Sequence, residues 1–166
     1  MTELNEPMIH ATLCFLLRKD PEPSILLGVK KRGFGKGKLN GIGGKLSPGE
    51  TPEEGIHREV FEEIRIRLEP TSLRAVANIT FWFPFRPEFN HYVHVFVSTK
   101  WSGEPMETDE IEPLWVPTAR IPYERMWADD AYWLPRVLIG ETLDAEFVFG
   151  EDNESVTDWT IRTRDG

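Results

Sequence analysis

A helix with a clearly marked start, Thr51–Ile64, constrains the fold more than any other part of the sequence. Thr51 is a good N-cap, Pro52 suits the first helical position, and Glu54 completes a T-x-x-E capping box. The helix also carries an apolar stripe, made up of Ile56, Val60 and Ile64. Such a stripe predicts that one face of the helix packs against a core.

The segments around this helix alternate between strand and loop patterns. Strands are predicted at His10–Leu17, Ile25–Lys31, Leu73–Phe85, Tyr92–Thr99 and Pro113–Pro117, with a closing hairpin of Ala145–Phe149 and Asp158–Thr163. A second helix is predicted from about Asp130 to Ile139, and Pro135 predicts that it is kinked or begins later. Strands interleaved with two helices predict an α/β fold, with a mixed sheet between helices. Because no linker or repeat divides the chain, we expect residues 1–166 to form a single domain.

Composition excludes several classes of partner. The formal net charge of −9 argues against a general surface for polymeric nucleic acid or for an anionic membrane, since both need a basic face. No apolar run approaches the length of a membrane span, and the N-terminal residues lack the pattern of a secretion signal. The single cysteine, Cys14, cannot form an internal disulfide, so we expect a cytoplasmic protein.

Three carboxylates share one side of the first helix. At about 100° per residue, Glu59, Glu62 and Glu63 fall within one arc, where each like-charged pair costs roughly 0.2–0.5 kcal/mol. A hard cation such as Mg²⁺ removes this repulsion, and the glycine-rich loop Arg32–Gly44 before the helix could approach a phosphate. A solvated acidic helix face is the alternative, and these residues alone leave both interpretations open.

The spacing around this helix resembles a known family. Gly44, Glu50 and Arg58-Glu59-Val60-Phe61-Glu62-Glu63 are similar to the Nudix box, G-x5-E-x7-R-E-U-x-E-E-x-G-U, with Ile66 at the last apolar position. One position departs, because Arg65 stands where the box has glycine. A glycine there would leave the helix with positive φ, and another residue costs about 1 kcal/mol. The resemblance implies a Nudix α/β/α sandwich.

The resemblance also implies a catalytic set. It assigns a metal, Mg²⁺ with Mn²⁺ as a possible substitute, to Glu59, Glu62, Glu63, Glu110 and the backbone carbonyl of Gly43. Arg58 would orient the glutamates through charge-assisted hydrogen bonds. Glu63 is the expected general base, and Glu59 and Glu110 are its competitors.

Further segments are similar to the Nudix hydrolases that act on oxidised purine nucleoside triphosphates. They are Leu26–Gly35, Asn40-Gly41, Met106–Glu110 and Met126–Asp130. This similarity implies hydrolysis of nucleotides such as 8-oxo-dGTP to the monophosphate and pyrophosphate by a monomeric enzyme. The expected substrate-binding residues are Thr12, Lys30, Phe34, Asn40, Phe81, Trp127, Asp129 and Asp130. ADP-ribose or a dinucleoside polyphosphate is the alternative substrate, and a non-catalytic nucleotide-binding module is a more distant alternative.

Some residues have an ordinary and a functional interpretation. Lys30, Lys31, Arg32, Lys36 and Lys38 form either a basic turn or a loop that attracts phosphate. Asp129 and Asp130 either cap the second helix or face the purine edge. His91 and His94 lie on opposite faces of one strand, so we predict structural roles for both, and a buried structural role for Cys14.

Overall fold

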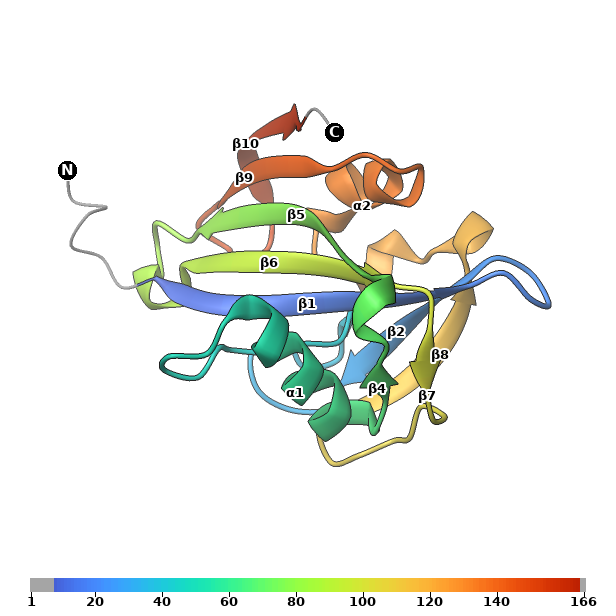
Figure 1. The fold of residues 1–166 in the computed structure, drawn as a ribbon. Helices are drawn as coiled ribbons and strands as arrows, with labels where there is room; N and C mark the ends of the chain where they lie inside the picture. The colour runs from blue at the N-terminus through green and yellow to red at the C-terminus, as the bar shows by residue number, and fades with distance from the viewer. Residues whose placement is uncertain (1–7, 165–166) are drawn as a thin grey trace.

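The computed structural model describes residues 8–164, and most of its strands belong to one mixed, eight-stranded sheet (Figure 1). The strand order is β10 (Val156–Thr163), β9 (Leu143–Phe149), β5 (Leu73–Trp82), β6 (His91–Ser98), β1 (Ile9–Arg18), β2 (Ser24–Lys30) and β3 (Leu39–Asn40), and β8 (Ile111–Pro117) pairs with β2. The pairs β1–β6 and β5–β9 are parallel and the other pairs are antiparallel. The predicted mixed sheet is therefore confirmed.

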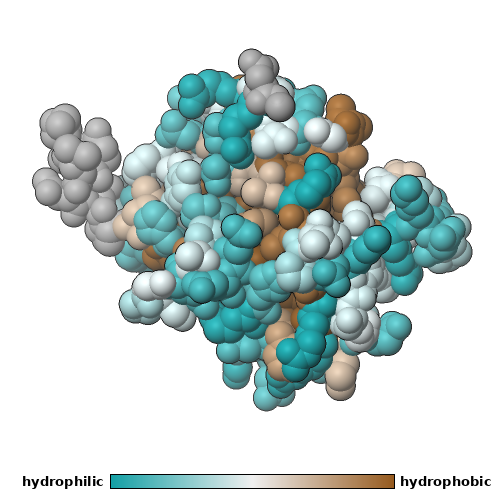
Figure 2. Space-filling view, in the orientation of Figure 1, coloured by the Kyte–Doolittle hydropathy of each residue, from teal (hydrophilic) through white to brown (hydrophobic). Residues whose placement is uncertain are grey.

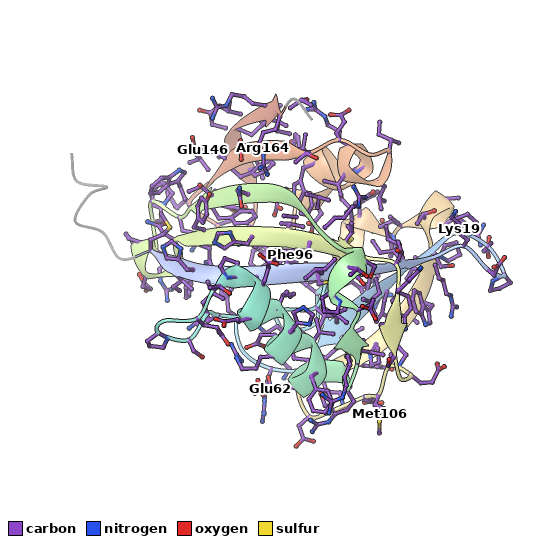
Figure 3. The ribbon with its side chains drawn as sticks, viewed as in Figure 1. Lys19, Glu62, Phe96, Met106, Glu146 and Arg164 are labelled. Atoms are coloured by element: carbon purple, nitrogen blue, oxygen red, sulfur yellow. The ribbon has the colours of Figure 1, made fainter. Side chains whose placement is uncertain are left out.

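The two helices cover opposite faces of this sheet. Helix α1 (Pro52–Ile64) packs its apolar stripe against Cys14, Leu16 and Phe96, and helix α2 (Asp130–Leu138) packs Trp133, Leu134 and Val137 against a second cluster that includes Phe15 and Val95. Because neighbouring residues of β1 belong to different clusters, its side chains alternate between the two helices. In Figure 3, Phe96 lies where α1 meets the sheet. The predicted sandwich is thus confirmed.

Strands β1 and β2 diverge, and this divergence positions the candidate site. Their register contains only the pairs Leu17–Ile25 and Arg18–Ser24, at one end of each strand. Farther along β1, the loop before α1 takes the neighbouring position, with isolated bridges from Cys14 to Ile42 and from Ala11 to Lys45. The glycine-rich loop is thereby placed against the middle of the sheet.

Helix α1 begins as the sequence predicts. The Thr51 hydroxyl accepts a hydrogen bond from the Glu54 N–H at 3.1 Å, and the Glu54 carboxylate accepts one from the Thr51 N–H at 2.9 Å. The helix ends at Arg65, which has φ 63° and ψ 30° and donates its N–H to the Phe61 carbonyl at 2.9 Å. Arg65 therefore adopts the left-handed conformation that glycine takes most readily.

We expect Arg65→Gly to raise the melting temperature by about 1–3 °C. Relief of the left-handed strain is worth about 1–2 kcal/mol, and the greater freedom of glycine in the unfolded chain offsets part of it. Asn153→Gly is the control, because Asn153 also has positive φ, at 57°, and asparagine tolerates that region better. Thermal unfolding measures both variants, and a lower melting temperature for Arg65→Gly would contradict the strain at this position.

The remaining elements differ from the prediction mainly at their ends. Helix α2 spans Asp130–Leu138, which confirms the predicted helix from about Asp130, and it continues through Pro135, so the alternative of a later start is excluded. Only the hydrogen bond that the Pro135 nitrogen would have donated within the helix is lost. Strand β5 stops at Trp82 rather than Phe85, and the short strands β3, β4 (Arg67–Leu68) and β7 (Trp101–Ser102) were not predicted.

Within residues 8–164, no helix is long and apolar enough to cross a membrane.

Figure 2 shows the face of the molecule that carries α1, and most of its surface is hydrophilic. Apolar surface gathers toward the region of α2 (Figures 1 and 2), where Tyr132 is 37% exposed and Ile139, next to the helix end, is 78% exposed. The stripe of α1 is buried, so this helix presents its polar residues to solvent.

Candidate active site

A cavity of about 340 Å³ opens where β1 and β2 diverge. It is bounded by the glycine-rich loop, by β5 and β6, and by the start of α2. All eight residues that were expected to bind substrate line it: Thr12, Lys30, Phe34, Asn40, Phe81, Trp127, Asp129 and Asp130. The fold therefore brings together residues from five separate parts of the chain.

Aromatic rings form much of the cavity wall. The Phe34 ring stacks on Trp127 with centroids 5.0 Å apart, and Phe83 stacks on Phe149 at 4.6 Å. Phe89 approaches Phe34 to 4.3 Å. A wall of this kind suits a flat heterocyclic base, since every base has a π-face that can stack on an aromatic side chain.

Asp129 and Asp130 line the cavity and are buried, 3% and 2% exposed. The Asp129 carboxylate accepts a hydrogen bond from the Trp133 indole N–H at 2.8 Å and makes no side-chain cap to α2. Asp130 Oδ2 is buried and has no hydrogen-bond partner among the described residues. The side-chain hydrogen bond that a helix cap would make is therefore missing, and the unpartnered oxygen of Asp130 favours the other interpretation, that this pair contacts a ligand.

Burial changes the ionisation of this pair. It raises the pKa of Asp129 to about 6, although the Trp133 hydrogen bond opposes the rise. Burial, together with the charge of Asp129, holds the pKa of Asp130 well above its usual range. Two adjacent buried carboxyls do not readily ionise together, so one of them keeps a proton near neutral pH. The pair then offers a ligand one donor as well as acceptors.

One carboxyl group of α1, that of Glu63, borders the same cavity. Glu63 lines it, and its Oε1 atom is buried without a hydrogen-bond partner among the described residues. Burial raises the pKa of Glu63 to about 8, with the charges of Glu59 and Glu110 adding to the rise and the Gly43 N–H and Lys30 opposing it. Glu62 instead points outward from α1 (Figure 3), with its side chain 57% exposed.

Arg58 connects these carboxylates. Its guanidinium donates to both oxygens of Glu50 at 2.7 and 2.8 Å, to Glu59 at 2.8 Å and to Glu62 at 3.0 Å. It also donates to the Lys45 carbonyl at 3.1 Å. These are the charge-assisted hydrogen bonds that were expected, and they fix α1 to the preceding loop.

Two glycines allow the loop to approach its neighbours closely. A Cβ atom on Gly43 would lie 2.0 Å from the Thr12 carbonyl oxygen, and one on Gly44 would lie 2.6 Å from Glu59 Oε2. Thr12 also binds the Gly44 carbonyl through its N–H at 2.9 Å and its hydroxyl at 3.2 Å. Any side chain at either position would move the loop away from β1 or from the carboxylates.

The donor set suits a hard divalent cation. The glutamates offer carboxylate oxygens, which Mg²⁺ prefers as ligands, and the buried Oε1 of Glu63 lacks a hydrogen-bond partner among the described residues. As the side chains lie, no group of three or more acidic, histidine or cysteine residues within residues 8–164 is assembled to hold a metal ion. Glu110 pairs with Arg32 through Oε1 at 2.6 Å, so this oxygen could bind a metal ion only if the ion pair opened or were shared.

The basic loop is largely neutralised. Lys31 pairs with Glu107, Arg32 with Glu110, and Lys38 with Glu154 at 3.3 Å. Lys30 lines the cavity and has no ion pair among the described residues. Of the basic residues considered for attracting phosphate, Lys30 is therefore the remaining candidate.

We expect Lys30→Gln to flatten the salt dependence of kcat/KM. Its charge faces the cavity, and salt screens such an attraction because the Debye length falls from about 30 Å at 0.01 M to about 10 Å at 0.1 M. The measurement is kcat/KM across that range. Lys36→Gln, in the same loop but outside the cavity lining, is the control. If Lys30→Gln keeps the wild-type salt profile, the loop is an ordinary basic turn.

Sequence reasoning missed some of the cavity wall. Phe89, Phe149 and His91 all line the cavity, and none of them was among the residues expected to bind substrate. His94 points to the other face, as expected, where it lies with His10 and Tyr92. Cys14 is fully buried and burial raises its thiol pKa, which confirms its predicted burial.

Comparison with known proteins agrees with this geometry. The family model described as NUDIX domain matches residues 8–137. The oxidized purine nucleoside triphosphate hydrolase of Mus musculus is 38% identical over 141 residues, covering 85% of this chain and 88% of the mouse protein. The Danio rerio protein of the same name is 45% identical over 114 residues, covering 69% and 71%.

Solved structures extend this likeness to the fold. The MutT protein of Bacillus halodurans superposes with a TM-score of 0.79 at 21% identity, covering 93% of this chain and 97% of that protein. The sequence of this chain matches the family model and the mouse relative, and its backbone matches the MutT structure. The same chain has the divergent strands, the glycine-rich loop against β1 and the glutamate face of α1. The protein therefore belongs to the Nudix hydrolase family.

Proposed function

We propose that this protein hydrolyses oxidised purine nucleoside triphosphates, such as 8-oxo-dGTP, to the nucleoside monophosphate and pyrophosphate. The observation that carries the proposal is the pair of buried carboxyls, Asp129 and Asp130, in an aromatic cavity that also contains Glu63 of the Nudix helix. The mouse and zebrafish relatives are named for hydrolysis of oxidised purine nucleotides. Such an activity would remove damaged precursors from the nucleotide pool.

In this proposal the base enters between aromatic rings and meets polar groups at its edge. Trp127 and Phe34 supply stacking faces, and Phe81 closes the wall. Asn40 uses its side-chain oxygen to accept the Gly41 N–H at 2.8 Å, which leaves its amide N–H groups for the base. Asp129 and Asp130 supply the donor and acceptors at the base edge, and Thr12 and Lys30 contact the substrate nearby.

The phosphate chain would extend from the base site toward α1. Nudix hydrolases use a divalent metal ion. We propose Mg²⁺, with Mn²⁺ as a substitute, held by Glu59, Glu62, Glu63, Glu110 and the Gly43 carbonyl. When bound, such an ion neutralises phosphate charge and makes a bound water more acidic. Arg58 orients the glutamates, and Glu63 is our proposed general base, with Glu59 and Glu110 as the competing candidates.

Further parts of the proposal concern the whole protein. We propose one Nudix domain over residues 1–166, acting as a monomer in the cytoplasm on small nucleotides rather than on polymeric nucleic acid. The continuous sheet from β1 to β10 supports a single domain. The net charge of −9 and the neutralised basic loop weigh against a nucleic-acid surface.

A nucleotide panel tests the proposed substrate class. The purified protein is assayed with 8-oxo-dGTP, dGTP, ADP-ribose and a dinucleoside polyphosphate, and pyrophosphate and orthophosphate release are measured separately. We expect the highest kcat/KM with 8-oxo-dGTP, and pyrophosphate as the product. Preference for ADP-ribose or a dinucleoside polyphosphate would reassign the substrate, and binding without turnover of any nucleotide would support the non-catalytic module.

We expect Mg²⁺ to raise the melting temperature by several degrees. At about 100 times its Kd, a ligand of the folded state alone stabilises by about 2.7 kcal/mol, and each kcal/mol is worth about 2–4 °C in a chain of this size. Glu63→Gln should weaken the rise, whereas Glu53→Gln, an exposed change on the same helix, should not. Thermal unfolding with chelator, with Mg²⁺ and with Na⁺ at equal ionic strength measures the effect. Equal melting temperatures under all three conditions would contradict a metal site on α1.

A further inference from the structure

His91 occupies a position in the cavity that the proposed function does not use. It is the first residue of β6 and lies between β1 and β5, where Ile9 and Phe81 are its Cα partners. Both of these partners also line the cavity. The imidazole is parallel to the Phe34 ring, with an interplanar angle of 14° and centroids 6.1 Å apart. His91 is thus part of the wall that a bound nucleotide would contact.

The hydrogen bond of His91 defines which nitrogen is free. Nδ1 is bonded to the Phe89 carbonyl oxygen, which can only accept, so Nδ1 carries the proton. Burial lowers the pKa of His91; the hydrogen bond to the Phe89 carbonyl opposes this shift, and the charges of Lys45 and Lys30 add to it. The net shift is downward, so the neutral ring is favoured. In a neutral ring with Nδ1 protonated, Nε2 is an acceptor. Among the described residues, no group donates to Nε2.

The neighbours of His91 indicate which part of a nucleotide it would meet. Asp129 and Asp130 enter the cavity from α2, whereas the charges acting on His91 are those of Lys30 and Lys45. Lys45 bridges to Ala11 on β1, two residues beyond the Cα partner of His91, and directly follows Gly44, which approaches Glu59. His91 therefore lies on the side of the cavity that leads from the base edge toward the carboxylates of α1, where the sugar links base and phosphates.

We propose that Nε2 of His91 accepts a hydrogen bond from a hydroxyl of the nucleotide sugar and so selects for substrates that carry it. This inference rests on the proposed function for the direction in which the nucleotide lies. The 2′ and 3′ hydroxyls offer the same chemistry, and substrates that lack one or both distinguish them. The contact is equally available before and during the reaction, so it acts on KM and leaves kcat unchanged.

Two substitutions separate the nitrogens of His91. His91→Gln places an amide near the Nε2 position and keeps an acceptor there. His91→Asn places an amide near the Nδ1 position, where it can still donate to the Phe89 carbonyl but cannot reach the sugar. If His91 acts only through its hydrogen bond to Phe89, the glutamine variant should lose more stability and activity than the asparagine variant. The proposed sugar contact predicts the opposite order for the effect on KM.

The experiment measures kcat and KM of the wild type and both variants with 8-oxo-GTP, 8-oxo-dGTP and the 2′,3′-dideoxy analogue. In the wild type we expect KM to rise about tenfold when the contacted hydroxyl is missing, the scale of one neutral hydrogen bond. A rise in KM between the first two substrates assigns the 2′ hydroxyl, and a rise between the last two assigns the 3′ hydroxyl. His91→Asn should lose this rise in KM, and His91→Gln should keep most of it.

Two results would overturn the inference. One is a wild-type protein with the same KM for all three substrates, a result that does not depend on any variant folding. The other is a His91→Asn protein whose KM rises as much as that of the wild type when the hydroxyl is missing. Both differ from failure of the proposed function, in which the wild type would not hydrolyse 8-oxo-dGTP at all. Melting temperatures of the variants identify any loss that arises from folding.

Discussion

Replacing Glu63 with glutamine is expected to lower kcat for nucleotide hydrolysis by about 10²–10⁴-fold, the usual contribution of a general acid or base. The Glu63 carboxylate lines the cavity, and one of its oxygens is buried without a partner among the described residues. Glutamine keeps the size of the side chain but cannot take a proton or neutralise a cation. Steady-state turnover of 8-oxo-dGTP at saturating Mg²⁺ measures the loss.

Stability and a matched variant separate this effect from unfolding. Without metal, Glu63→Gln should be at least as stable as the wild type. Burial disfavours the ionised form of Glu63, and glutamine is neutral at every pH. Glu53→Gln makes the same chemical change on an exposed turn of α1 and should keep wild-type turnover. Near-wild-type activity in Glu63→Gln would exclude this residue from the mechanism.

Asp129→Asn and Asp130→Asn are each expected to reduce kcat/KM for 8-oxo-dGTP by about 10- to 100-fold, while dGTP hydrolysis changes less. An 8-oxoguanine ring has an N7–H that guanine lacks, so a carboxylate acceptor near N7 favours the oxidised base. Loss of one such hydrogen bond in a buried site costs about 1–3 kcal/mol. Steady-state kinetics on both substrates, with thermal unfolding of the same samples, measure the effect. Loss of stability with an unchanged substrate ratio would make the pair structural.

The same pair predicts a pH dependence of stability. Burial raises the pKa of Asp129 to about 6, above its value in the unfolded chain, so the folded state holds this proton more tightly. The resulting stabilisation is complete below the unfolded pKa of about 3.9 and is lost as pH rises through about 6. Asp129→Asn removes this loss. The melting temperature of the wild type should therefore fall relative to that of the variant between pH 4.5 and pH 7. A constant difference would show that Asp129 ionises freely.

Local signals made the Nudix helix predictable, and long-range contacts made other features unpredictable. The capping box of Thr51 and Glu54 and the stripe through Val60 are complete within the helix, and the structure confirms them. The pairing of Glu110 with Arg32 joins residues 78 positions apart and leaves no trace in either local sequence. Periodicity placed His91 and His94 on opposite faces, but only the packing of the strands shows which face borders the cavity.

Short elements were missed for a related reason. Strands β3, β4 and β7 have two residues each, too few to show an alternating pattern. They exist because a neighbouring strand supplies their hydrogen bonds, as β2 does for Leu39 and Asn40. The cavity residues were found because they resemble a family pattern, whereas propensity alone would have placed Phe34 and Trp127 in unremarkable loops.

The hydrogen bonds of Arg58 bear on the order in which this protein folds and acquires its metal. A guanidinium that already binds Glu50, Glu59 and Glu62 supplies positive charge to α1 from within the chain. We therefore expect the newly made polypeptide to reach its folded state without a metal, unlike small zinc domains, in which metal binding drives folding. Removing the ion should then abolish hydrolysis reversibly, without unfolding the protein. The concentration of free divalent cation, rather than the amount of folded protein, would set the activity.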